Sequence, residues 1–150
     1  TALAELRELL PTDTPAAVDA FPLTLIGRRH LRDNNSWMHN APKLMKGRAR
    51  CTLLLHPDDA ARCGLTDGQT ALVTSRTGQV QLPAEITDDI MPGVVSIPHG
   101  YGHHRPGTRQ NTASQFAGVS LNDLTDELEL DALTGNAAFS NVVVRVEAYW

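Results

Sequence analysis

Short apolar segments bounded by turn-forming residues recur along this chain, and this pattern restricts the fold more than any other feature. Segments separated by Asp-Gly or Thr-Gly turns are typical of β structure. Six strands are predicted, over residues 21–26, 51–55, 70–75, 79–86, 94–97 and 142–149. Short strands with little helix between them predict a mainly β domain that closes into a small barrel.

The last strand has the clearest period. Val142, Val144 and Val146 alternate with polar residues such as Arg145, so one face is expected to be buried. Residues 56–63 are expected to form a short helix, because Pro57 suits a first helical turn and a glycine follows at position 64.

Residues 1–20 differ from the rest of the chain. Leucines recur at helical spacing up to Pro11, and a stretch rich in Pro, Thr and Asp follows. We expect residues 1–20 to be a helix and connector from a preceding domain, and residues 21–150 to be the domain itself. A first residue Thr1 and the lack of a signal-peptide pattern favour a segment of a larger protein.

A chain of 150 residues fits one domain, and it has no run of about 20 apolar residues that would span a membrane. Its two cysteines, Cys51 and Cys63, do not form a CxxC pair. Two free thiols in a reducing compartment are expected, and hence a cytoplasmic location, although one disulfide between them stays open.

Two long stretches, residues 28–50 and 98–119, show neither strand nor helix period and are expected to be loops. The segment from Gly27 to Arg50 holds seven bases, and Asp33 is its only acid, in a chain of net charge −4. Such a loop suits an anionic ligand, although a basic loop that is simply exposed to solvent would have the same composition. Nucleic acid fits less well, because nucleic-acid-binding domains are usually basic as a whole.

The first loop also has the side chains that a phosphorylated heteroaromatic ligand requires. Gly27 allows close backbone approach, and the arginines offer donors that match phosphate oxygens. Asn34, Asn35 and Ser36 can read the edge of a heterocycle, and Trp37 and Met38 offer apolar backing. The alternative is that Asn-Asn-Ser forms a turn and that Trp37 is a core anchor.

Five further motifs follow this loop in order. They are Leu55-His56-Pro57-Asp58-Asp59-Ala60, Gly64-Leu65-Thr66-Asp67-Gly68, Ser75-Arg76-Thr77-Gly78, Met91-Pro92-Gly93-Val94-Val95 and Asn122-Asp123-Leu124-Thr125. Together, from about Leu23 to Val146, they resemble the C-terminal molybdopterin-dinucleotide-binding domain of the dimethyl-sulfoxide-reductase, formate-dehydrogenase and nitrate-reductase superfamily. The resemblance implies a double-psi β barrel of about six strands with one or two short helices and two long loops.

The resemblance also implies a cofactor site and a substrate funnel. The implied cofactor-binding residues are Gly27, Arg28, Arg29, His30, the following run to Asn34 and Asn35, then Ser36, Trp37, Met38, Asn122, Asp123, Leu124 and Asn141. Asn141 stands in for a lysine that some relatives carry near this point. Pro98, His99, Gly100 and Tyr101 would lie at the funnel.

The implied function is that of a cofactor-binding domain in a molybdenum or tungsten oxidoreductase. It would hold molybdopterin guanine dinucleotide, with upstream domains of the same polypeptide as partners and the metal ligated there. The chain alone would have no turnover. Two alternatives stay open: a free-standing barrel for protein or nucleic-acid interaction, and a small metal-dependent hydrolase that uses His99, His103 and His104. The parent's substrate is not inferred, because residues 34–37 depart from the nitrate-reductase pattern.

Overall fold

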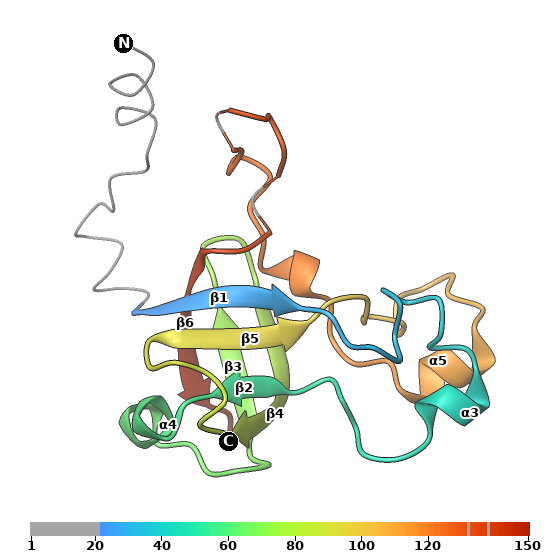
Figure 1. Ribbon diagram of the computed structural model, residues 1–150, viewed down its shortest axis with the longest axis horizontal. Coiled ribbons are helices and arrows are strands. Elements are labelled where there is room, and N and C mark those ends of the chain that lie inside the picture. Colours follow the sequence, from blue (N-terminus) through green and yellow to red (C-terminus); the bar gives the residue numbers. More distant parts are fainter. Residues whose placement is uncertain (1–21, 132, 138) are drawn as a thin grey trace.

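The computed structural model describes residues 22–131, 133–137 and 139–150. The helix and connector expected within residues 1–20 therefore lie outside the described residues. The six strands are β1 (Leu23–Arg28), β2 (Leu53–Leu55), β3 (Thr70–Thr74), β4 (Gln79–Ile86), β5 (Val94–Pro98) and β6 (Val142–Ala148). They close into a barrel in the order β1-β5-β2-β4-β3-β6 (Figure 1). The predicted six-stranded barrel is confirmed.

Parallel and antiparallel pairs are mixed in this barrel. β1 runs parallel to β5, and β2 runs parallel to β4, while β2 and β5 are antiparallel. The β3–β4 hairpin joins the ring on one side, and β6 closes it by pairing antiparallel with both β3 and β1. Each strand thus has two neighbours, and closure removes the exposed edges that would otherwise pair with other chains.

Alternating apolar side chains fill the barrel. The fully buried ones include Leu25, Leu53, Leu55, Val73, Val95, Ile97 and Val144. Burying one such side chain stabilises the fold by about 1.5–3 kcal/mol. In β6, Val144 and Val146 point inward and Val143 points outward, so the predicted alternation is confirmed.

The helix α4 (Pro57–Cys63) also forms where the sequence predicts it. The His56 ring accepts a hydrogen bond from the Asp58 backbone N–H, and Gly64 ends the helix with a φ of 66°. Asp59 is buried, forms an ion pair with Arg62 and accepts from the Gly93 N–H at 2.7 Å. The helix is therefore fixed to the turn that precedes β5.

The sequence expectation was incomplete in the two long loops. They contain α3 (Pro42–Met45) and α5 (Asn111–Gln115), and a 3-10 turn η1 (Leu121–Asp123) follows the second loop. Helices of four and five residues are too short to show a helical period. Arg28 and Pro98, expected at the starts of the two loops, are instead the last residues of β1 and β5, where they pair with each other.

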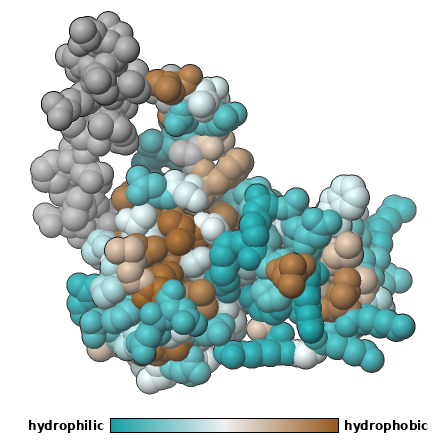
Figure 2. All heavy atoms as spheres, in the orientation of Figure 1, coloured by the Kyte–Doolittle hydropathy of each residue, from teal (hydrophilic) through white to brown (hydrophobic). Residues whose placement is uncertain are grey.

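The two loops fold against each other beside the ends of β1 and β5, as Figure 1 shows at the right. We call residues 29–50 and 99–119 the loop lobe. Hydrophilic side chains cover most of its visible face, with a few hydrophobic ones between them (Figure 2). Among the described residues, no helix has the length and apolar character needed to cross a membrane.

Candidate functional site

Close backbone contact joins the two halves of the loop lobe. Gly100 has a φ of 99°, and a Cβ at this position would lie 2.3 Å from the carbonyl oxygen of Asn35. Only glycine accommodates both that conformation and that contact. The first loop and the second loop are therefore packed together, backbone against backbone.

A buried carboxylate organises the lobe interior. Asp33 is 1% exposed, and its Oδ1 accepts hydrogen bonds from Nε and Nη2 of Arg50 at 3.1 and 2.8 Å. Hydrogen bonds between charged groups are about twice as strong as neutral ones. Because Asp33 and Arg50 lie near opposite ends of the first loop, this pair closes the loop on itself.

The second loop adds an aromatic residue and a histidine to this carboxylate. The Tyr101 hydroxyl donates to Asp33 Oδ2 at 3.1 Å, and burial together with the Asp33 charge raises the pKa of Tyr101 to about 12. His39 is fully buried, and its Nε2 lies 3.4 Å from Asp33 Oδ1, outside hydrogen-bond geometry. Its Nδ1 lies 2.7 Å from His103 Nε2. We call Asp33, His39, Arg50, Tyr101 and His103 the lobe cluster.

A groove of about 780 Å³ runs along the first loop. We call it the loop groove, and it is lined by Arg29, His30, Leu31, Arg32, Asn34, Asn35, Met38 and Leu44. Seven of these are cofactor residues predicted from the sequence: Arg29, His30, Leu31, Arg32, Asn34, Asn35 and Met38. Asn34 and Asn35 have positive φ of 42° and 61°, a conformation that asparagine adopts more readily than most residues. The groove combines guanidinium, amide and apolar surface.

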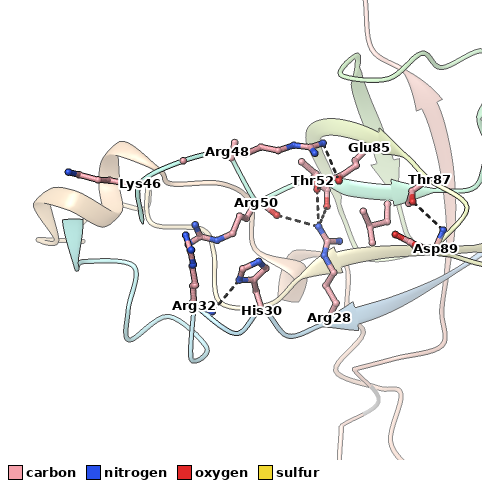
Figure 3. A pocket seen from close by; sticks show the side chains of 13 residues that line it. Arg28, His30, Arg32, Lys46, Arg48, Arg50, Thr52, Glu85, Thr87 and Asp89 are labelled. Atoms are coloured by element: carbon pink, nitrogen blue, oxygen red, sulfur yellow. Dashed lines mark hydrogen bonds and ion pairs between the residues drawn. The ribbon is translucent and has the colours of Figure 1, made fainter. Parts of the chain in front are cut away.

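A second hollow of about 570 Å³ lies between the first loop and the barrel (Figure 3). We call it the barrel-side groove. Its charged walls hold five bases, Arg28, Arg32, Lys46, Arg48 and Arg50, against two acids, Glu85 and Asp89. Arg48 pairs with Glu85 at 3.1 Å. Among the described residues, Arg32 and Lys46 form no ion pair, so their charges are available to an anion. His30 and Arg32 line both grooves.

Arg28 has structural contacts that the sequence did not reveal. Its Nη1 donates to the Ser96 carbonyl at 2.5 Å, and its Nη2 donates to the carbonyl and hydroxyl oxygens of Thr52 at 2.8 and 2.9 Å. Burial lowers the pKa of Arg28, opposed mainly by the charge of Glu85. Arg28 therefore ties β1 to β5 and to Thr52, the residue before β2; Figure 3 shows the contact with Thr52. Its contact with a cofactor stays a prediction.

The other cofactor residues predicted from the sequence lie outside both grooves. Ser36 and Trp37 lie on the same loop, and Trp37 is 81% exposed, so it is not the core anchor considered above. Leu124 is buried in the core, and Asp123 forms an ion pair with Arg105. Asn141 is exposed and has a φ of 69°.

The 3-10 turn that contains Asn122 nevertheless lies against the end of β1. A Cβ on Gly27 would lie 3.0 Å from Leu121 Cδ2, so glycine here lets this turn approach the strand. The first loop and the Asn122 turn therefore start from the same end of the barrel. The contact of Asn122 with a cofactor stays a prediction.

Two of the predicted funnel residues, His99 and Tyr101, have different surroundings. The His99 ring lies 6.4 Å from the Phe139 ring, and burial, aided by Arg29, lowers its pKa. Tyr101 is buried in the lobe cluster, where it holds the lobe together instead of lining an open surface. Within the described residues, no set of three His, Cys, Asp or Glu side chains is arranged to hold a metal.

Sequence reasoning missed the partnership of His39 and Arg50 with Asp33. One signal was present, since Asp33 is the only acid among seven bases in its segment. A lone acid in such a segment is a natural counter-ion for buried bases.

The chain is similar in sequence to a known family and to several known proteins. Residues 23–144 match the family described as "Molydopterin dinucleotide binding domain". The chain is 30% identical to a tetrathionate reductase polypeptide of Salmonella typhimurium, over 81% of this chain and 13% of that protein. It is 34% identical to a putative dimethyl sulfoxide reductase chain of Escherichia coli, over 82% and 15%. For biotin sulfoxide reductase of Cereibacter sphaeroides the identity is 28%, over 93% and 18%.

The fold is also found in a solved structure. Acetylene hydratase from Pelobacter acetylenicus superposes with a TM-score of 0.75 at 21% identity, over 90% of this chain and 19% of that one. The chain thus spans less than a fifth of each of these proteins. Its matched residues include the whole barrel up to Val144, both grooves and the lobe cluster. The chain belongs to the molybdopterin-dinucleotide-binding domain family.

Proposed function

We propose that the loop groove and the barrel-side groove together hold one pterin dinucleotide on behalf of a larger molybdenum or tungsten oxidoreductase. The observation that carries this proposal is the loop groove, in which arginine, asparagine and methionine side chains of one loop converge. When bound, the cofactor and its metal supply the redox chemistry. The residues of this chain bind it, orient it and exclude water.

Each part of the cofactor has matching side chains. Arg29 and Arg32 offer guanidinium donors to the pyrophosphate oxygens. Asn34 and Asn35 offer paired donors and acceptors to the edge of the pterin, and Met38 gives apolar backing. These groups fit the cofactor chemically. Asn34 and Asn35 are exposed and Met38 is half-buried, so all three side chains can be reached by a ligand.

The guanine form of the dinucleotide is the more specific part of the proposal. Asp89 lines the barrel-side groove together with Arg32 and Lys46. A carboxylate accepts hydrogen bonds and so suits the adjacent N–H donors of guanine, whereas cytosine offers one amino group. A groove that holds this carboxylate as well as arginine and lysine side chains therefore favours a guanine nucleotide.

The activity of the parent enzyme is also a proposal. The tetrathionate, dimethyl sulfoxide and biotin sulfoxide reductases named above are oxidoreductases, and this chain covers 13–18% of their length. We propose that the parent is a reductase or dehydrogenase of this kind, that its remaining domains ligate the metal, and that this chain alone has no turnover. Free Cys51 and Cys63 support a reducing, cytoplasmic setting.

A nucleotide-binding experiment on the chain tests the proposal. Guanosine diphosphate carries the nucleoside and pyrophosphate of the cofactor, and calorimetry should show that it binds more tightly than cytidine diphosphate. Arg32→Ala should weaken its binding on the order of ten- to a hundredfold, because a charge-assisted hydrogen bond contributes about 1.5–3 kcal/mol.

Lys43→Ala is the matched control. Lys43 lies in the same loop and carries the same charge, but it lines neither groove. A specific contact predicts that Lys43→Ala changes binding much less than Arg32→Ala. Equal effects of the two variants would show general attraction to a basic loop and would contradict the proposed site.

A further inference from the structure

Two histidines, one from each long loop, meet inside the lobe. His39 Nδ1 and His103 Nε2 are 2.7 Å apart, and the two rings lie edge to face with centroids 5.0 Å apart. His39 is fully buried, whereas His103 is half-buried and so within reach of solvent protons. The pair joins positions 64 residues apart in the sequence.

The surroundings determine which nitrogen carries a proton. Two imidazole nitrogens at this distance need one hydrogen between them. His39 Nε2 faces the carboxylate of Asp33 at 3.4 Å, so that nitrogen is the protonated one in the neutral ring. His39 Nδ1 then accepts a hydrogen bond from His103 Nε2–H.

The pair tolerates one additional proton but not two. With one, His39 becomes a cation beside Asp33, and its Nδ1–H donates to His103, whose remaining proton moves to Nδ1. With two, both rings present N–H groups to each other across 2.7 Å, and two positive charges face one another. No hydrogen bond between the rings survives in that state.

The neighbouring groups oppose full protonation. In the first loop, the negative charge of Asp33 favours the protonated form of His39, whereas the positive charge of Arg50, which is bound to the same carboxylate, disfavours it. In the second loop, the Gly100 backbone weakly favours protonated His39, and the Tyr101 hydroxyl donates a hydrogen bond to Asp33. Burial is the largest influence and lowers the pKa of both histidines, and His39 lowers that of His103 further. Because folding lowers the pKa of these histidines, the folded lobe is most stable above pH 6.5, the ordinary pKa of histidine. It loses stability as the pH falls below 6.5.

We propose that the His39–His103 pair is an acid-released latch between the two long loops, which opens the loop lobe when both rings are protonated. Asn35 of the loop groove packs against Gly100, three residues before His103, so release of the second loop removes one support of that groove. The consequence for cofactor retention rests on the proposed function. The loop transition itself does not, and it is measured without cofactor.

Tryptophan fluorescence offers a direct test. The chain has two tryptophans, and Trp150→Phe leaves Trp37, on the first loop, as the only one. In that background we expect a reversible fluorescence change below pH 6.5 that depends on about two protons, so that the opening equilibrium changes by about a hundredfold per pH unit. Circular dichroism should show that the barrel stays folded through the transition.

Two variants separate the latch from a general acid effect. His103→Gln keeps an N–H donor for His39 Nδ1 but does not titrate, so the midpoint should move to lower pH and the slope should fall to one proton or less. His104→Gln removes an exposed histidine next to it and should leave the transition unchanged. A wild-type slope of one proton, the absence of any transition, or equal shifts in the two variants would overturn the proposal.

Histidine ¹⁵N NMR of the unmodified chain gives a check that needs no variant. At neutral pH we expect His39 to be protonated on Nε2 and not on Nδ1, and both rings to become cationic in the pH range in which the lobe opens. The opposite tautomer of His39 would overturn the proposal even if His103→Gln did not fold.

Discussion

The barrel and the loop lobe are held together by different forces. The barrel interior is apolar, with residues such as Leu53 and Ile97 completely buried. The lobe interior is polar, built on Asp33, and the lobe leaves large apolar side chains such as Leu31 almost fully exposed. Apolar burial depends little on pH or salt, whereas buried ionic groups depend strongly on their partners. We infer that the barrel is a rigid support and that the loop lobe is a binding surface whose conformation responds to pH and to the loss of charged partners.

Removal of the central carboxylate should have the largest local effect. Asp33→Ala leaves Arg50 buried without its counter-ion, which destabilises by about 3–5 kcal/mol. We expect the opening free energy of residues 29–50 to fall by about that amount in hydrogen exchange, while amides of the barrel keep their protection. Equal loss of protection in both regions would break the comparison.

A core truncation should act on the barrel instead. Leu53→Ala creates a cavity among fully buried residues and should lower the free energy of unfolding by about 2–5 kcal/mol in urea. The same change at Leu31, which is 98% exposed, should alter stability by less than about 0.5 kcal/mol. If Leu31→Ala were comparably destabilising, the lobe would have an apolar core of its own.

Tyr101→Phe tests the polar interior of the lobe without a change in shape. Loss of the hydrogen bond to the Asp33 carboxylate should destabilise the lobe by about 1.5–3 kcal/mol. Folding raises the Tyr101 pKa to about 12, so the tyrosine stabilises the lobe fully below pH 10 and loses this effect as the pH rises from 10 towards 12. Hydrogen exchange of the wild type should show that alkaline loss, and the variant should lack it.

A pair of glycines separates backbone strain from loop contact. Gly100 and Gly107 have similar positive φ, 99° and 91°, but a Cβ at Gly107 meets nothing within 4 Å, whereas one at Gly100 meets Asn35. Gly107→Ala should destabilise by about 1 kcal/mol from strain alone, and Gly100→Ala by more, at most about 3 kcal/mol. Equal effects on thermal unfolding would show that the Gly100–Asn35 contact contributes nothing.

The sequence predicted the barrel better than the lobe, for a physical reason. Strand periods such as that of Val142 to Val146 are local, because alternation along one strand reports which face is buried. The lobe cluster depends on contacts between residues up to 68 positions apart, such as Asp33 and Tyr101, which no local period records.

Within the site, composition predicted more than geometry did. The excess of bases and the Asn-Asn pair pointed to the first loop, and Arg29, His30, Asn34, Asn35 and Met38 do converge on one groove. The sequence could not show that Arg28 has hydrogen bonds to Ser96 and Thr52, or that Trp37 is exposed. Those outcomes depend on where β2 and β5 lie relative to the end of β1.

The measurement that addresses the cofactor-binding claim most directly is NMR shift mapping of the ¹⁵N-labelled chain during a titration with guanosine diphosphate. We predict that the largest shifts fall on residues 29–38 and on those lining the barrel-side groove, such as Arg48 and Asp89, while the backbone of β3 is unaffected. Saturable shifts confined to another face of the barrel, or no shifts in residues 29–38 at millimolar nucleotide, would contradict it.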